Sequence, residues 1–223
     1  YFGYARADRK TSGRESITAK LTANLLEKSG VDRVLAMDLH SAQIQGYFDI
    51  PCDHIYGSPV LIDYLESLDL EEIVVVSPDV GGVARARAFA KLMNDAPLAI
   101  IDKRRSAHNI AESLTVIGEV KGKTAILIDD MIDTGGTICS GANLLKKEGA
   151  NRIFACASHA VFSPPSYERL SSKNLFEQVI VTNSIPVIHK DNFPQLKVLS
   201  VANMLGEAIW RIHEESSVSS MFR

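Results

Sequence analysis

Several features are scarce in this sequence, and each scarcity argues against a class of protein. Cysteine occurs three times in 223 residues, at the widely spaced positions Cys52, Cys139 and Cys156, with no CxxC pair. This pattern indicates a reducing compartment and no structural zinc. No apolar run approaches the ~18 residues that cross a bilayer, and a net charge of −3 gives no electrostatic basis for binding nucleic acid. We therefore expect neither a membrane nor a nucleic acid as partner.

The composition is otherwise that of an ordinary globular protein, with 46% apolar and 23% charged residues. Its length suits one large domain or two modest ones. The chain starts with Tyr1 rather than Met, and its first residues, YFGYARAD, are typical of the end of a strand already under way. We expect that further sequence precedes it. The expected compartment is the cytoplasm, or a plastid if a transit peptide preceded this chain.

Short apolar segments rich in β-formers alternate with longer helical ones. Several of these apolar segments lack polar alternation, as strands covered on both faces do. Strands are expected at 31–37, 73–77, 98–101, 125–128, 153–157, 178–181 and 198–201. Helices are expected at 16–29, 59–68, 83–92, 137–148 and 202–213. Gly30 and Gly149 follow two of these helices as C-terminal caps. This order predicts an α/β fold with mainly parallel sheet.

The best candidate for a domain boundary is the segment 50–59, which is punctuated by Pro51, Gly57 and Pro59. Dividing the chain there leaves a short first domain, 1–57, and a more complete second domain, 58–211. The tail, 212–223, carries Phe222, an apolar side chain that a docked tail would bury. We expect the tail to pack back on the first domain.

The segment AILIDDMIDTGGTI (125–138) combines an apolar strand with an acidic cluster. In open α/β sheets, ligands bind beyond the carboxyl ends of the strands, where Asp129 and Asp130 are expected. The loop that follows leads into a helix and contains Asp133, Thr134, Gly135, Gly136 and Thr137. Its backbone N–H groups and hydroxyls can cradle a phosphate, while the two carboxylates accept hydrogen bonds from a vicinal diol. A sugar phosphate satisfies both halves and offsets the repulsion between the carboxylates.

A plainer alternative explains part of the same segment. Acidic and hydroxyl side chains are common at the start of a helix, so Asp133 or Thr134 can serve as an N-cap without any ligand. The double aspartate after a hydrophobic strand, followed by TGGT, is more specific than either half alone. We therefore predict a phosphate and ribose site, with which a capping role is compatible.

This segment resembles the phosphoribosyl diphosphate-binding motif of type I phosphoribosyltransferase folds. The rest of the chain resembles the ribose-phosphate diphosphokinases, also called phosphoribosyl pyrophosphate synthetases, in YFGYARADRK, MDLHSAQIQGYFDIP, VVSPDVGGVARARAFA and IDKRR. The spacing is closest to the phosphate-activated class, and details such as FSPPSYERL look plant-like. The resemblance implies two tandem type I phosphoribosyltransferase-like domains with mainly parallel sheets, the first of them truncated here.

The resemblance implies that the diphosphoryl group of ATP is transferred to the 1-hydroxyl of ribose 5-phosphate, with Mg²⁺ as cofactor and AMP leaving. Such chemistry requires charge neutralisation on the phosphates and in-line positioning. The predicted ribose 5-phosphate site is the acidic pair and loop described above. Lys103 and Arg105, which flank Arg104 in IDKRR, match the cations that a flexible loop brings over the transferring phosphate. They are the predicted catalytic pair.

Three further positions match residues of the ATP site. Arg6 and Asp8 match ATP-binding residues, although Ala7 stands where the family often has glutamine. His40 matches a histidine near the ATP phosphates and Mg²⁺, and we predict catalytic, ATP-binding and metal roles for it; a structural hydrogen bond is the alternative. Asp79 in SPDVGG matches a Mg²⁺ or substrate carboxylate, and a simple turn is the alternative there.

The resemblance also implies regulation and assembly. Family enzymes of this class bind inorganic phosphate or ADP between subunits, and the matching residues are Lys10, Arg14, Gln45, Ser217 and Ser219. Ala42 departs from the pattern, since a serine is often found there. Family members form dimers and hexamers, so a homo-oligomer is expected.

Two rival functions remain at this point. An ordinary phosphoribosyltransferase shares the acidic pair and TGGT, but it does not account for MDLHSAQIQGYFDIP or for the Lys103 and Arg105 segment. A non-catalytic regulatory subunit that resembles the synthetase is the second. Such relatives interrupt the catalytic loop, whereas IDKRRSAHN is intact here, which favours an enzyme.

Overall fold

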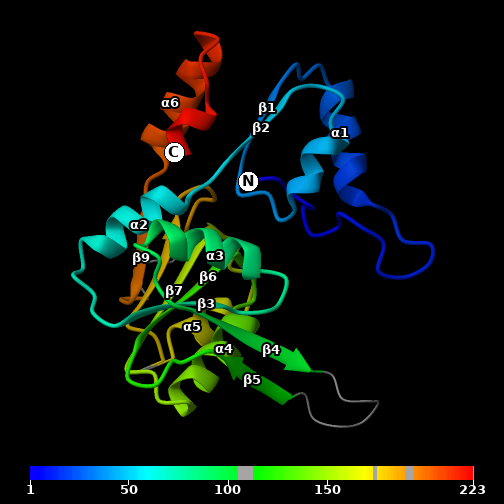
Figure 1. The fold of residues 1–223 in the computed structure, drawn as a ribbon. Helices are drawn as coiled ribbons and strands as arrows, with labels where there is room; N and C mark the ends of the chain where they lie inside the picture. Colours follow the sequence, from blue (N-terminus) through cyan, green and yellow to red (C-terminus); the bar gives the residue numbers. More distant parts are fainter. Residues whose placement is uncertain (105–112, 173–174, 189–192, 223) are drawn as a thin grey trace. The chain divides into compact units, whose positions relative to one another are not determined.

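The computed structural model describes residues 1–104, 113–172, 175–188 and 193–222. The chain divides into two compact units (Figure 1). Unit 1 comprises Tyr1–Gly57 and Val201–Arg223, and unit 2 comprises Ser58–Ser200. The helix α6 (Ala202–His213) therefore belongs to unit 1, whereas the sequence-based division sets the second boundary at residue 211.

Unit 2 is built, in the residues described, on a seven-stranded sheet with the order β5-β4-β3-β6-β7-β8-β9. The strands are β3 (Ile73–Ser77), β4 (Leu98–Arg104), β5 (Ser113–Ile117), β6 (Thr124–Ile132), β7 (Arg152–Ala160), β8 (Gln178–Thr182) and β9 (Leu196–Leu199). Neighbouring strands are parallel except for the antiparallel pair β4–β5. The expected α/β class with mainly parallel sheet is confirmed.

Helices cover both faces of this sheet, because successive strand residues point to opposite sides. On one face, Ile126 and Ile128 of β6 pack with α2 (Ser58–Glu66) and α3 (Val83–Leu92). On the other face, Leu127 packs with α4 (Gly136–Lys147) and α5 (Ser166–Leu170). The central strands are buried from both sides, which explains their continuous apolar runs.

Unit 1 combines a short parallel pair of strands with helices. Its elements are α1 (Thr18–Lys28), β1 (Val34–Met37), η1 (Ala42–Tyr47), β2 (Cys52–Ile55), α6 and η3 (Ser219–Phe222). A small core forms around Phe2, Ile44 and Phe48. The ring of Phe222 lies edge-on to Tyr56 at 5.9 Å between centroids, so the apolar end of the tail contacts the segment after β2.

The structure differs from the expected elements at several places. β2, β5 and the short helix α5 are additional, and residues 1–8 contain turns rather than the end of a strand. β4 continues to Arg104 and β6 to Ile132, beyond their expected ends. These extensions and β5 depend on pairing partners distant in sequence, since Lys103 pairs with Leu114 and Ile132 with Ala160.

The two glycine caps expected from the sequence are confirmed. Gly30 and Gly149 have positive φ values of 96° and 87°, as C-terminal caps require. All three cysteines are free thiols. None of the helices in the described part of the chain combines the length and apolarity needed to span a bilayer.

Candidate functional site

The acidic motif lies at the point where the strand order of the unit 2 sheet reverses. From β3 the chain crosses to β4 on one side, and β6 later pairs with the other side of β3. Such a reversal leaves a crevice beyond the carboxyl ends of the two strands, where open α/β sheets bind ligands. The loop 78–82 follows β3 there, and Asp129 and Asp130 lie in the last half of β6.

Asp129 and Asp130 are bridged by an arginine that the sequence analysis did not single out. Nη1 of Arg85, near the start of α3, lies 3.2 Å from Oδ1 of each carboxylate. The side chain of Asp130 is only 2% exposed, and that of Asp129 is 22% exposed. The expectation that ligand groups offset the repulsion of the pair is therefore incomplete, because the protein supplies a counter-charge of its own.

The environment of Asp129 favours its protonated form. Burial, together with the hydrogen bond and charge of Asp130, raises the pKa of Asp129 to about 8, although Arg85 acts in the opposite direction. Oδ1 of Asp129 also accepts the backbone N–H of Asp130 at 2.9 Å. The negative charge of the pair, and with it its strength as a hydrogen-bond acceptor, grows as the pH rises through about 8.

The glycine-rich loop leads directly into α4. Gly135 is the N-cap residue of this helix with a φ of 73°, and no side chain among the described residues caps it. The alternative in which Asp133 or Thr134 is the N-cap is therefore wrong. A Cβ at Gly135 would lie 3.3 Å from Cγ of Leu170, so glycine suits both the conformation and the space. The N–H groups of the first turn of α4 have no intrahelical acceptors and favour an anion.

A second arginine lies beside this loop. Nη1 of Arg169, on α5, donates to the carbonyl oxygen of Thr134 at 3.1 Å. A Cβ at Gly136 would lie only 3.3 Å from the same nitrogen. Thr134 and Thr137 are exposed and Asp133 is half-buried, so donors and one cation surround the start of α4. The sequence motif around Thr134 does not point to Arg169, because this residue lies 35 positions further along the chain.

Asp79 has a structural role at the same edge of the sheet. Its Oδ1 accepts the backbone N–H of Gly82 at 2.8 Å, which stabilises the loop before α3. Asp79 is nevertheless exposed. It can therefore stabilise the turn that the sequence suggests and also offer a carboxylate oxygen to a ligand.

The predicted catalytic cations lie on or after β4. Lys103 is exposed and pairs with Leu114 in the β4–β5 ribbon, so the loop expected at Lys103 is not found there. Arg105 lies outside the described residues. Pairing with β5 extends β4 beyond Ser77, the last residue of its parallel neighbour β3, so Lys103 lies on a strand rather than in a loop.

The predicted ATP residues belong to unit 1. Arg6 is exposed and Asp8 is half-buried, and the carbonyl oxygen of Asp8 accepts the hydroxyl of Tyr47. His40 is exposed directly after Leu39, whose N–H donates to Nε2 of His54 at 3.0 Å. His54, to which no sequence motif points, thus stabilises the backbone that carries His40.

In the predicted regulatory segment, the loop before α1 already binds a carboxylate. Thr11 and Ser12 donate their N–H and hydroxyl groups to Glu15 over 2.7–3.1 Å. These hydrogen bonds lower the pKa of Glu15 to about 2. Lys10 and Arg14 flank this arrangement and are exposed.

The other predicted regulatory residues lie elsewhere in unit 1. Gln45 donates to the carbonyl oxygen of Ala42 at 3.1 Å within η1. The hydroxyls of Ser217 and Ser219 lie 3.0 Å apart, and Arg211 of α6 donates to the carbonyl oxygen of Ser217 at 3.1 Å. The regulatory assignment as a whole stays a prediction.

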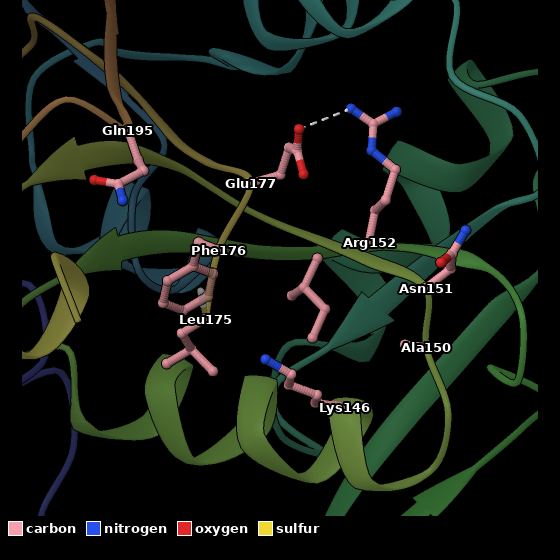
Figure 2. A pocket seen from close by; sticks show the side chains of 9 residues that line it. Lys146, Ala150, Asn151, Arg152, Leu175, Phe176, Glu177 and Gln195 are labelled. Atoms are coloured by element: carbon pink, nitrogen blue, oxygen red, sulfur yellow. Dashed lines mark hydrogen bonds and ion pairs between the residues drawn. The ribbon is translucent and has the colours of Figure 1, made fainter. Parts of the chain in front are cut away.

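A cavity of about 370 Å³ lies at the other end of the sheet (Figure 2). It is lined by residues next to the starts of β7, β8 and β9, including Arg152, Glu177 and Gln195. Arg152 pairs in register with Thr124, the first residue of β6, so this cavity lies away from Asp129 and Asp130. Arg152 and Glu177 form an ion pair of 3.3 Å in its lining, and the cavity does not contribute to the candidate site.

Known proteins of one family match this chain. A family model described as the phosphoribosyl synthetase-associated domain matches residues 104–223, and one described as the N-terminal domain of ribose phosphate pyrophosphokinase matches residues 1–30. A ribose-phosphate pyrophosphokinase of Prochlorococcus marinus subsp. pastoris is 96% identical over all 223 residues. Ribose-phosphate pyrophosphokinase 1 of Spinacia oleracea is 66% identical over 225 aligned positions. This chain spans 67% of the length of each.

A solved structure gives the same result for the fold. The crystal structure of phosphoribosylpyrophosphate synthetase from Mycobacterium smegmatis matches with a TM-score of 0.89 and 44% sequence identity. The match covers 97% of this chain and 70% of that one. It confirms the expected fold class, α/β with type I phosphoribosyltransferase-like architecture. The phosphate-activated and plant-like subclass stays a prediction.

Proposed function

Because this chain belongs to the ribose-phosphate pyrophosphokinase family, we propose that it transfers the diphosphoryl group of ATP to the 1-hydroxyl of ribose 5-phosphate. The products are 5-phosphoribosyl 1-diphosphate, for nucleotide biosynthesis, and AMP. Membership of the family makes the chain a diphosphotransferase enzyme. The two substrates, the metal and the roles of individual residues are the proposed part.

The main support for the proposal is that hydrogen-bond acceptors lie next to hydrogen-bond donors at the carboxyl ends of the strands of the unit 2 sheet. Asp129 and Asp130 offer carboxylate oxygens to the hydroxyls of ribose. The loop 133–137 offers backbone N–H and hydroxyl donors to the 5-phosphate, with Arg169 beside it. A phosphate monoester carries close to two negative charges at neutral pH, which suits a helix N-terminus and a guanidinium.

In the proposed reaction, the ribose 1-hydroxyl attacks the β-phosphorus of ATP. A bond forms between that oxygen and the β-phosphorus, and the hydroxyl proton is released to water. The bond between the β-phosphorus and the oxygen that bridges it to the α-phosphorus breaks, and AMP leaves with that oxygen. Lys103 and Arg105 neutralise the charge that develops on the transferring group. Arg6, Asp8 and His40 of unit 1 are the proposed ATP ligands.

Mg²⁺ is the proposed cofactor, and when bound it neutralises the phosphates of ATP. Among the residues that the structure describes, no three His, Cys, Asp or Glu side chains gather as a metal site. Mg²⁺ is commonly held by one or two carboxylates together with substrate phosphates and water. The exposed carboxylate of Asp79 is a suitable donor in unit 2. A metal role is also proposed for His40 of unit 1.

We also propose that the enzyme forms a homo-oligomer, from dimer to hexamer, with inorganic phosphate or ADP as effectors. Unit 1 exposes apolar side chains that assembly would cover, among them Leu21 and Leu25 on α1 and Ile209 and Trp210 on α6. For the effectors, the proposed residues are Lys10, Arg14, Gln45, Ser217 and Ser219. Light scattering with and without phosphate or ADP tests both proposals.

The test of the proposed reaction is the formation of AMP from ATP, Mg²⁺ and ribose 5-phosphate, followed by chromatography. The assay uses this chain and a version extended to the full length of its relatives, of which this chain spans 67%. AMP is expected from the full-length protein. A phosphoribosyltransferase would instead consume 5-phosphoribosyl 1-diphosphate together with a base, and a non-catalytic subunit would bind substrates without turnover. Either of these results would overturn the proposal.

A further inference from the structure

Arg85 connects two parts of unit 2 that lie far apart in sequence. It is on α3, 44 residues before Asp129, and its Nη1 atom lies 3.2 Å from Oδ1 of both Asp129 and Asp130. Its own side chain is 26% exposed and that of Asp130 is 2% exposed. Two adjacent, largely buried carboxylates without a counter-charge are costly. The bridge from Arg85 therefore allows both to occupy this edge of the sheet.

Building on the proposed function, we propose that Arg85 is a positioning residue for the sugar half of ribose 5-phosphate. Its guanidinium fixes Oδ1 of both carboxylates and favours their charged forms, and Asp129, the more exposed of the two, accepts hydrogen bonds from the ribose hydroxyls. Arg85 thereby sets both the affinity for the sugar and the pH range in which the sugar binds.

The charge balance separates this role from phosphate binding. The charge of Arg85 is shared by two carboxylates, and the three groups together are negative when both carboxylates are ionised. A phosphate gains little from such a cluster. Its donors lie instead at the start of α4 and on Arg169, which contacts Thr134. Removing Arg85 should therefore weaken recognition of the sugar hydroxyls and leave recognition of the phosphate largely intact.

The groups around Asp129 give the direction of the pH effect. The charged groups acting on it are Asp130 on the same strand and Arg85 on α3. The flanking strands add no charge at this level, since Ala157 of β7 pairs with Asp129 and β3 ends at the buried Ser77. Arg85 lowers the pKa of Asp129. Without it, this pKa rises and the fully ionised pair forms only at more alkaline pH.

The test compares Arg85→Met with Arg85→Lys and with the control Arg87→Met, which removes an exposed arginine from the same helix. Calorimetry measures binding of ribose 5-phosphate and of ethyl phosphate, a phosphate probe without vicinal hydroxyls, from about pH 7 to about pH 9.5. We expect Arg85→Met to weaken ribose 5-phosphate binding about tenfold at neutral pH, because charge-assisted hydrogen bonds are about twice as strong as neutral ones. The loss should shrink at high pH, and ethyl phosphate binding should persist. Lysine should restore most of the affinity.

A second variant keeps the test decisive if Arg85→Met folds poorly. Asp129→Asn removes the repulsion between the two carboxylates. Arg85→Met should therefore change ribose 5-phosphate binding much less in this variant than in the unsubstituted chain. Unchanged affinity and an unchanged pH profile in Arg85→Met overturn the inference, as does an equal loss for both ligands at every pH. Failure of the unsubstituted chain to bind ribose 5-phosphate overturns the proposed function itself, which distinguishes the two failures.

Discussion

Gly135, at the start of α4, provides a direct test of the phosphate loop. Its φ is 73°, and Gly122, in the turn before β6, has a nearly identical φ of 74°. A Cβ at Gly135 would lie 3.3 Å from Cγ of Leu170, which is 1% exposed, whereas a Cβ at Gly122 would meet nothing within 4 Å. Alanine at the two sites therefore introduces the same backbone strain, but it disturbs packing next to the loop at Gly135 alone.

The expected magnitudes follow from this comparison. A side chain in the left-handed region costs about 1–2 kcal/mol, and each kcal/mol lowers the melting temperature of a chain this size by about 2–4 °C. Both variants should show such a loss, and Gly135→Ala somewhat more, because Leu170 must move by a few tenths of an ångström. If the loop holds the phosphate, displacing even one charged hydrogen bond costs about 1.5–3 kcal/mol. Gly135→Ala should then bind ribose 5-phosphate about tenfold or more weakly.

The assay combines thermal unfolding of the two variants with calorimetric titration by ribose 5-phosphate. Gly122→Ala should lose stability and keep the affinity of the unsubstituted chain. The reasoning is refuted if Gly135→Ala binds ribose 5-phosphate as tightly as Gly122→Ala does, since the loop would then not contact the phosphate.

Three further predictions concern single residues. The pKa of Asp129 is raised from 3.8 to about 8, so the stability that its protonated form contributes is full below about pH 4 and is lost as the pH rises through about 8. In urea unfolding, the free energy of unfolding of Asp129→Asn should therefore decline less from pH 5 to pH 8 than that of the unsubstituted chain. Parallel declines in the two proteins would contradict this. Arg169→Met should weaken binding of inorganic phosphate and ribose 5-phosphate by about the same factor, roughly tenfold for one lost charged contact; calorimetry with both ligands checks this, and a loss confined to the sugar phosphate would argue against it. Lys103→Ala and Arg105→Ala, each in the version extended to the length of its relatives, should lower the rate of AMP formation at least about a hundredfold, which is the effect of removing one hydrogen-bond donor to a transition state. Neither substitution should change the affinity for ribose 5-phosphate much. Near-normal turnover of either variant would remove that residue from the catalytic pair.

The comparison of sequence and structure is most informative at β6. The apolar run 125–128 and the acidic pair predict a strand and a ligand-binding edge, because both signals are local and contiguous. The local sequence does not indicate where the strand ends. β6 continues to Ile132 because β7 supplies partners as far as Ala160, and this extension buries Asp130 rather than leaving it in a loop.

β5 illustrates the same limit at the edge of the sheet. The segment SLTVI is short, and it becomes a strand through antiparallel pairing with β4, from Ile100 with Ile117 to Arg104 with Ser113. Local sequence specifies neither the partner nor the register of such a strand. Helices were easier to predict: α3 and α6 have the expected bounds, since helical hydrogen bonds form within the segment itself.

The sequence by itself determined the fold class, the longer helices and the chemistry of the central motif, because strand pattern, glycines, carboxylates and hydroxyls all lie within a few residues of one another. Only the tertiary structure decided which charges meet that motif. Arg85 reaches it across 44 residues through the packing of α3 on β6, and Arg169 reaches Thr134 across 35 residues through the packing of α5 on α4. Contacts of this kind depend on how helices cross a sheet, and no local pattern of residues encodes them.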